Sequence, residues 1–289
     1  MIREFFVFAR QDGGFSGVSI LSAGEAGYGA QMKVSIALAV LSLQALQLCA
    51  LAGNSVVNLS HYDLMRPDFG RMREEGVLGI IHESSYPKYV RDEKYASRQE
   101  AAVGAGMLWG AYHFADASSP TRQAEHFLDV VQSSWRRARP GGRPNEILLV
   151  LDFEKNGHYP GGTMRVDQAA QFVEHVYRRT GHYPGLYGSE YRLQQILNAY
   201  GVQPADRQLL SRCWLWVANY HHTPGPVPPF RNWQMWQYTG DGVCELPRSS
   251  HPKSIANIKN AERNIFRGET EALREFWQTN GWKPDAVSE

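Results

Sequence analysis

The feature that most constrains the fold is an aliphatic run that ends in two acids. Residues 147–154 read ILLVLDFE. A buried run of this length, with turn-forming residues on both sides, predicts a strand covered on both faces, as in a parallel sheet with helices outside it. Because successive side chains on a strand point to opposite faces, Asp152 and Glu154 should share one face while Phe153 packs on the other.

Two neighbouring carboxylates repel each other, and partial burial penalises the ionised form, so one of the pair should stay protonated near neutral pH. A protonated acid beside an ionised one suits cleavage of a glycosidic bond: the first protonates the leaving oxygen, and the second stabilises positive charge on the sugar. The alternative is that Asp152 and Glu154 are structural, acting as caps or salt-bridge partners. An isolated Asp-x-Glu does not decide between these two interpretations.

Composition favours one catalytic domain. The 289 residues are 43% hydrophobic and 12% aromatic, enough for one large core, and barrels commonly form a single domain of this size. The net charge of +1 argues against a nucleic-acid partner. The one basic cluster, residues 136–143, is predicted to lie in a solvated Pro/Gly loop.

Residues 32–52 differ from the rest of the chain. The apolar run 34–43 and the small-x-small pattern Ala50-Leu51-Ala52 predict a secretory signal with its own start methionine, cleaved near Ala52-Gly53. The protein would then be secreted or periplasmic, and residues 1–31 would be an N-terminal extension or an unused upstream start. The alternative is a membrane anchor, because the run is just long enough to span a bilayer.

The chain after this segment alternates short apolar runs with amphipathic stretches. We expect a barrel domain over 53–268 and a C-terminal helix and tail over 269–289. The predicted strands are 55–59, 77–82, 107–114, 147–153, 185–187, 214–219, 233–239 and 258–266, and the predicted helices lie near 67–75, 93–105, 120–134, 164–180, 190–199 and 269–277. Repeated strand–helix units in one domain predict a parallel α/β barrel. The Pro-rich link 223–229 leaves little room for a helix, so loops should join the last strands.

In such a barrel the carboxyl ends of the strands form the active site. The predicted strand ends carry acids, amides, histidines and aromatic rings, which suits a polysaccharide because aromatic faces stack on sugar rings and polar groups bind hydroxyls. Each aromatic residue taken alone is more often part of a core. The predicted substrate-binding residues are Asn58, Ser60, His82, Tyr112, His113, Phe114, Tyr187, Trp216, Tyr220, Gln237 and Tyr238.

Seven motifs in order resemble one enzyme family: VxNLSH, GxIHES, GAYHF, LDFExN, GLYG, LWVANY and WQYT. They are similar to the glycoside hydrolase family 25 lysozymes (muramidases) of bacterial or phage origin, over residues 55–267. The resemblance implies an α/β TIM-like barrel of five strand–helix units followed by three further strands, no cofactor and no metal. It also implies cleavage after N-acetylmuramic acid with retention of configuration. Glu154 would be the general acid, and Asp152 would assist the acetamido group of the substrate, which acts as internal nucleophile.

The chain departs from the family pattern at two acidic positions. The family usually has Asp where this chain has Asn58, and Lys-Ala-Thr-Glu-Gly where it has residues 82–86; a further family Asp matches Glu262 loosely. An amide can bind a sugar but supplies no charge. From the sequence alone, Asn58→Asp should raise activity and move its alkaline limit to higher pH, because an added like charge keeps Glu154 protonated.

Other chemistries have weaker support. No HExxH, CxxC, GxSxG or phosphate-binding glycine motif occurs, and adjacent His221 and His222 cannot both face one site on a strand. Cys213 and Cys244 flank two strands. If those strands are parallel, the two cysteines lie roughly 20 Å apart, too far for a disulfide.

Two functional hypotheses follow. The first is a monomeric enzyme that acts on peptidoglycan glycan strands without a stable protein partner. The second is a glycan-binding protein of the same fold whose altered positions have weakened or abolished turnover. The intact pair of Asp152 and Glu154 favours the enzyme, because a pure binding protein has no evident reason to keep it.

Overall fold

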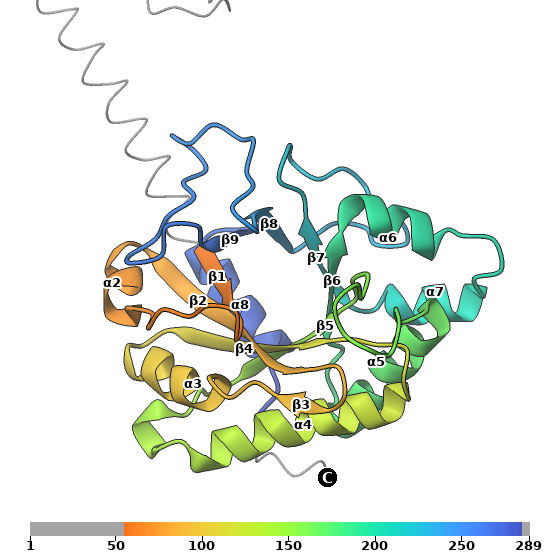
Figure 1. Ribbon diagram of the computed structural model, residues 1–289, viewed down its shortest axis with the longest axis horizontal. Helices are drawn as coiled ribbons and strands as arrows, with labels where there is room; N and C mark the ends of the chain where they lie inside the picture. Colours follow the sequence, from red (N-terminus) through yellow and green to blue (C-terminus); the bar gives the residue numbers. More distant parts are fainter. Residues whose placement is uncertain (1–54, 285–289) are drawn as a thin grey trace, which may run out of the picture. The chain divides into compact units, whose positions relative to one another are not determined.

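A computed structural model describes residues 55–284 (Figure 1). The strands are β1 (Ser55–Leu59), β2 (Val77–Tyr86), β3 (Val90–Arg91), β4 (Leu108–Phe114), β5 (Ile147–Asp152), β6 (Gly185–Ser189), β7 (Trp214–Ala218), β8 (Met235–Thr239) and β9 (Glu262–Phe266). The helices are α2 (Phe69–Glu74), α3 (Tyr95–Gly104), α4 (Pro120–Arg137), the 3-10 turn η1 (Pro140–Gly142), α5 (Val166–Thr180), α6 (Glu190–Leu197), α7 (Pro204–Leu210) and α8 (Thr270–Asn280).

Eight strands close into a barrel. They are ordered β1-β9-β8-β7-β6-β5-β4-β2, and β1 pairs with β2 to close the ring, while β3 lies outside it against β2. Helices α3, α4 and α5 lie on the outside of the strands (Figure 1). The prediction of an α/β TIM-like barrel with three closing strands is therefore confirmed.

Three local expectations are corrected. The closing strand β9 is antiparallel to both β1 and β8, so the barrel is mixed and not fully parallel. Strand β3 and helix α7 were not predicted. Finally, α4 continues to Arg137, so Arg136 and Arg137 lie in its last turn and not in a loop. Cations there are favourable because the carbonyl end of a helix carries partial negative charge.

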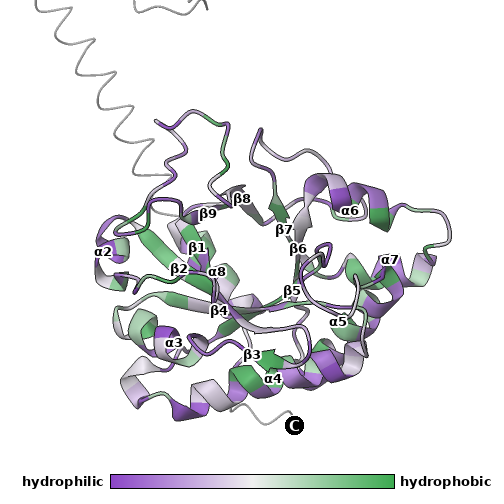
Figure 2. Ribbon diagram, in the orientation of Figure 1, coloured by the Kyte–Doolittle hydropathy of each residue, from purple (hydrophilic) through white to green (hydrophobic). Residues whose placement is uncertain are grey.

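The alternation predicted for β5 is present. Leu148 and Val150 belong to the core inside the barrel, whereas Leu149, Leu151 and Phe153 belong to the layer between the strands and the helices. Figure 2 shows hydrophobic colour on β1 and β2 and mixed colours on α4. This alternation turns Asp152 towards the barrel interior.

Helix α8 closes the end of the barrel where the strands begin. The Trp277 indole is buried and donates to the carbonyl of Trp109 at 2.8 Å. A Cβ at Gly79 would lie 2.9 Å from this ring, so only glycine lets the indole approach. The backbone of Ile147, the first residue of β5, also pairs with Trp282. Because this end is filled, any open site must lie at the carboxyl ends of the strands.

Cys213 precedes β7 and Cys244 follows β8. These strands are parallel, and both thiols are buried and free, as predicted. Within residues 55–284, no helix has the length and apolarity needed to cross a membrane. The predicted signal segment at 32–52 lies outside the described residues.

Candidate active site

A cavity of about 420 Å³ opens at the carboxyl ends of the barrel strands. It is lined by Asn58, Ser60, Tyr62, Glu83, Tyr112, Phe114, Asp152, Glu154, His158, Tyr159, Tyr187, Trp216, Tyr220, Asp241 and Glu262. Nine of these were predicted from the sequence: Asp152, Glu154, Asn58, Ser60, Tyr112, Phe114, Tyr187, Trp216 and Tyr220. They come from β1, β4, β5, β6 and β7, or from the residues directly after them, so the barrel brings them together.

Two predicted histidines lie outside this cavity, because side chains on a strand alternate. His82 is buried, stacks against Trp109 and contacts Arg98 through Nε2 at 3.0 Å. His113 stacks on Phe172 between the barrel and α5. Burial lowers the pKa of His82 to about 3 and that of His113 to about 4. Both are neutral packing residues, and the structure offers no substrate contact for either.

The two predicted residues of β8 also lie away from the cavity lining. Tyr238 packs against Trp236 and donates its hydroxyl to the Pro252 carbonyl at 3.0 Å. Gln237 is buried behind the lining residue Tyr187 and accepts a hydrogen bond from the Tyr187 hydroxyl. Gln237 can therefore orient Tyr187, whereas Tyr238 belongs to the outer core.

The two acids occupy different depths. Asp152 ends β5 and is 7% exposed, and its Oδ1 is buried with no hydrogen-bond partner among the described residues. Glu154 lies two residues beyond it and is partly exposed. Between them, the Phe153 amide donates to the Tyr187 carbonyl at 2.9 Å, which fixes the backbone that carries both carboxyl groups.

Both carboxyl groups hold protons more tightly than usual. Burial raises the pKa of Asp152 well above its ordinary value, and the charges of Glu154, Glu83 and Glu262 add to this. Burial also raises the pKa of Glu154, assisted by the charge of Asp241 and opposed by Arg192. Burial therefore favours the protonated form of each group, and a proton held on Glu154 is what acid catalysis requires.

A row of aromatic rings borders the cavity and is here called the aromatic wall: Tyr62, His61, Tyr86, Tyr159 and Phe114. Of these, Tyr62, Tyr159 and Phe114 are lining residues. Successive ring centroids in this row lie 4.0 to 5.7 Å apart. The Tyr62 and Tyr159 hydroxyls are hydrogen-bonded at 2.7 Å. Apolar ring faces beside polar hydroxyls suit a sugar ring.

A chain of amides connects β7, β9 and β1 beneath the cavity. The indole Nε1 of Trp216 donates to Asn264 Oδ1 at 2.7 Å, and Asn264 Nδ2 donates to Asn58 Oδ1 at 2.9 Å. Asn58 Nδ2 then donates to Glu262 Oε2. Glu262 faces Asn58 directly in the register of β1 and β9.

A second cavity of about 520 Å³ lies on the other side of Glu154. It shares Glu154, Tyr220 and Asp241 with the first cavity and is otherwise lined by Ser189, Glu190, Tyr191, Gln194, Ala218, Asn219, His221 and His222. Asp152 lines only the first cavity. Glu154 thus lies where two cavities meet.

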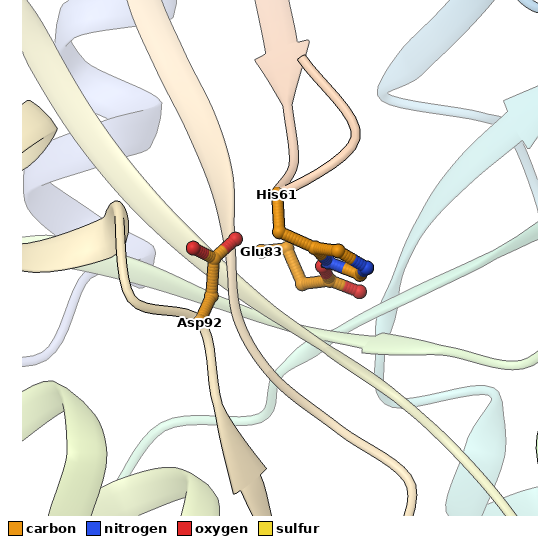
Figure 3. Close-up of side chains that lie close together, drawn as sticks. All are labelled: His61, Glu83 and Asp92. Carbon is orange, nitrogen blue, oxygen red and sulfur yellow. The ribbon is translucent and has the colours of Figure 1, made fainter. Parts of the chain in front are cut away.

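His61, Glu83 and Asp92 form a group that could offer ligand atoms to a metal ion (Figure 3), since one such atom from each lies within 4.8 Å of the others. His61 Nδ1 is already in hydrogen-bond contact with Glu83, which raises the pKa of the imidazole. The charges of Lys94 and Arg98 also act on Asp92. A divalent cation would have to break the contact between His61 and Glu83 and would lie near the positive charges of Lys94 and Arg98. The group therefore fits an ion-pair network better than a metal site.

Six cavity residues were absent from the predicted set: Tyr62, Glu83, His158, Tyr159, Asp241 and Glu262. Strand alternation could have found Glu83, because Ile81 on the same face of β2 lies in the inner core. Tyr62, His158, Tyr159 and Asp241 lie in loops, where no sequence period indicates direction. Glu262, which matched the family pattern only loosely, lies opposite Asn58 in the register of β1 and β9.

Comparison with known proteins identifies one family. The model of the glycosyl hydrolases family 25 matches residues 57–245, which excludes β9 and Glu262. Lysozyme M1 of Streptomyces globisporus is 27% identical over 163 residues, 53% of this chain and 50% of that protein. An autolytic lysozyme of Clostridium acetobutylicum is 31% identical over 64 residues, 22% of this chain and 20% of that protein. The matches thus span half or less of these curated relatives.

Solved structures show the same fold. A bacterial lysozyme from Streptomyces coelicolor superposes with a TM-score of 0.60 at 20% identity, covering 79% of this chain and 99% of that one. A family GH25 lysozyme from Aspergillus fumigatus superposes with a TM-score of 0.55 at 19% identity, covering 77% and 98%.

Proposed function

Because the chain belongs to the glycosyl hydrolases family 25, we propose that it hydrolyses the β-1,4 bond between N-acetylmuramic acid and N-acetylglucosamine in peptidoglycan. The observation that carries this proposal is the pair formed by a buried Asp152 and a partly exposed Glu154 beside an aromatic wall, with Glu154 lining both cavities. A general acid must touch the oxygen between two sugars. Glu154 and Asp241 line both cavities, and of these two Glu154 is the one that follows Asp152 at the end of β5.

The same arrangement assigns a direction to the glycan strand. Asp152 lines only the first cavity, and its role is to accept the N–H of the acetamido group that attacks the anomeric carbon. The N-acetylmuramic acid residue therefore binds in the first cavity, beside the aromatic wall. The leaving N-acetylglucosamine binds in the second cavity, near Asn219 and His222.

The test is whether the full-length protein releases reducing ends from purified cell wall. Reduction of the products with borohydride before acid hydrolysis should convert muramic acid, and not glucosamine, to its alcohol. Reduced glucosamine would mean that the other glycosidic bond is cut. The glycan strand is the only partner that the proposal needs, with the chain acting as a monomer and without a cofactor.

A catalytically weakened glycan-binding protein is the second candidate, and Asn58 is the observation that favours it. An amide replaces a carboxylate in the cavity and so removes one charge that the family pattern has. This candidate predicts that the protein sediments with insoluble wall while no reducing ends appear over prolonged incubation. Turnover by the wild-type protein would reject it.

The aromatic wall should contribute to substrate binding. Tyr159→Ala is expected to raise KM about five- to tenfold with a smaller change in kcat, because ring stacking on a sugar contributes about 1 kcal/mol. Tyr200→Ala is the matched control, since this exposed tyrosine lines neither of the two cavities. An unchanged KM in Tyr159→Ala would show that the wall does not contact the substrate.

Export is proposed from the pattern before Gly53. Mass spectrometry of protein recovered from the medium or periplasm should find a mature N-terminus near Gly53. Ala52→Leu should block cleavage, because the peptidase pocket accepts only small side chains, and the longer precursor should accumulate. An intact Met1 terminus in the cytosol would contradict this proposal.

A further inference from the structure

The direction of the hydrogen bonds beneath the cavity is fixed at one end. An indole N–H can only donate, so the Asn264 side-chain oxygen is the acceptor for Trp216. The Asn264 NH2 group then donates to Asn58 Oδ1 and to the Val56 carbonyl. The Asn58 carbonyl is thereby occupied as an acceptor. Its NH2 group must then point at Glu262 Oε2. The chain of hydrogen bonds that starts at Trp216 therefore ends with a donor, the Asn58 NH2 group, facing Glu262.

The second oxygen of Glu262, Oε1, is left without a hydrogen bond among the described residues. Glu262 is a lining residue and is partly exposed, and within residues 55–284 its side chain has no hydrogen-bond partner besides Asn58. Because Asn58 donates to Oε2, a proton carried by Glu262 lies on Oε1. That hydrogen is free to bind a ligand in the first cavity.

The surroundings favour a neutral Glu262. Five carboxyl groups line the first cavity, those of Glu83, Asp152, Glu154, Asp241 and Glu262, and its lining residues include no Lys or Arg. Burial raises the pKa of Glu262 to about 8; the charges of Asp63, Asp241 and Glu154 add to this, and the Asn58 hydrogen bond opposes it.

The other groups around Glu262 supply no positive charge. The facing hydroxyls of Tyr112, Tyr187 and Tyr220 are neutral, since burial raises the pKa of each phenol. The next residue along β9, Arg263, donates to the carbonyls of Pro252 and Ser254. The Arg263 guanidinium is therefore bound to these backbone oxygens. The pKa of Glu262 is raised although Arg263 is its neighbour in sequence.

We propose that Glu262 acts as a neutral carboxylic acid that donates a hydrogen bond from Oε1 to an acceptor oxygen of the sugar in the first cavity. Asn58 holds the opposite oxygen, so the acid cannot turn its hydrogen away from the substrate. This inference rests on the proposed function for the identity of the ligand. It gives Asn58 a positioning role that an Asp at this position could not perform.

The sharpest variant is Glu262→Gln, because an amide copies a neutral acid. The Gln carbonyl accepts from Asn58, and its NH2 group donates into the cavity. Activity at pH 6 should stay within about threefold of wild type, whereas an ionised Glu262 would lose a charge and about tenfold or more in rate. Glu262→Met keeps the length and removes both functions. It should raise KM about tenfold.

Asn58→Asp reverses the expectation drawn from the sequence alone. A carboxylate at 58 accepts from Asn264 and has no hydrogen for Glu262, so the Glu262 proton moves to the contact with residue 58 and is lost to the cavity. Activity should fall about tenfold, the cost of one hydrogen bond to substrate. The same loss is expected in the Glu262→Gln background, because the Gln amide turns to donate to Asp. Higher activity in either background would overturn the proposal.

A titration makes the inference independent of turnover. In protein with ¹³C-labelled Glu carboxyl groups, the resonance missing from Glu262→Gln should report a neutral acid at pH 7 and ionise near pH 8. Ionisation below pH 6 would overturn the proposal whether or not the enzyme is active. If the wild-type protein releases no reducing ends, the proposed function fails. Binding of soluble muramyl oligosaccharides, weakened by Asn58→Asp but not by Glu262→Gln, would still support this inference.

Discussion

Glu154→Gln is expected to lower the rate of wall hydrolysis about 10²–10⁴-fold, the usual contribution of a general acid. Gln keeps the shape of the side chain and removes the transferable proton. The initial rate of reducing-end release, per mole of folded protein, measures the effect. Because burial raises the pKa of Glu154, the wild-type acid stays protonated to higher pH than an ordinary Glu, and activity falls as pH rises through this pKa.

The control for Glu154 is Glu174→Gln, which neutralises a carboxyl group paired with Arg178 on helix α5, away from both cavities. It should leave the rate unchanged. Binding of Glu154→Gln to insoluble wall should match that of wild type, since the proton is needed only during bond cleavage. If Glu154 were merely structural, the variant would melt earlier while each folded molecule turned over normally.

Asp152→Asn should lower kcat about 10²–10³-fold, as expected when one group that stabilises developing charge is removed. An amide can still accept the N–H of the substrate acetamido group, so KM should change little. It cannot balance the positive charge that forms as the acetamido oxygen attacks. Steady-state kinetics on soluble muramyl oligosaccharides separate the two parameters.

Stability distinguishes this role of Asp152 from a structural one. The pKa of Asp152 is raised well above its ordinary value by burial, so ionisation of this group costs stability in the folded protein at pH above its unfolded pKa. Asn removes that cost. The variant should therefore melt at the same or a higher temperature than wild type at pH 7, while losing activity. A lower melting temperature with unchanged kcat would contradict the catalytic role.

Much of the fold follows from local sequence pattern. The ILLVLDFE stretch alone predicted a doubly covered strand, and the repeated strand–helix rhythm predicted the barrel. Period-two alternation then placed Asp152 inward and Phe153 outward, as found. Alternation also explains why His82 and His113 were wrongly placed in the site. Each lies next to a lining residue, Glu83 or Tyr112, and therefore points to the opposite face of its strand. The sequence shows that side chains alternate, but only the closed barrel decides which of the two sets faces its interior.

Two properties of the site required the tertiary structure. Loop residues such as Tyr159 and Asp241 reach the cavity through chain turns that no sequence period encodes. The state of Glu262 depends on contacts with Asn58, Asn264 and Trp216, which come from three strands up to 206 residues apart. The sequence by itself determined the barrel strands, the alternation of side chains along them and the acid pair, because these depend on neighbours along the chain. Only the closed barrel decided hydrogen-bond direction and charge, because both depend on groups that meet through space.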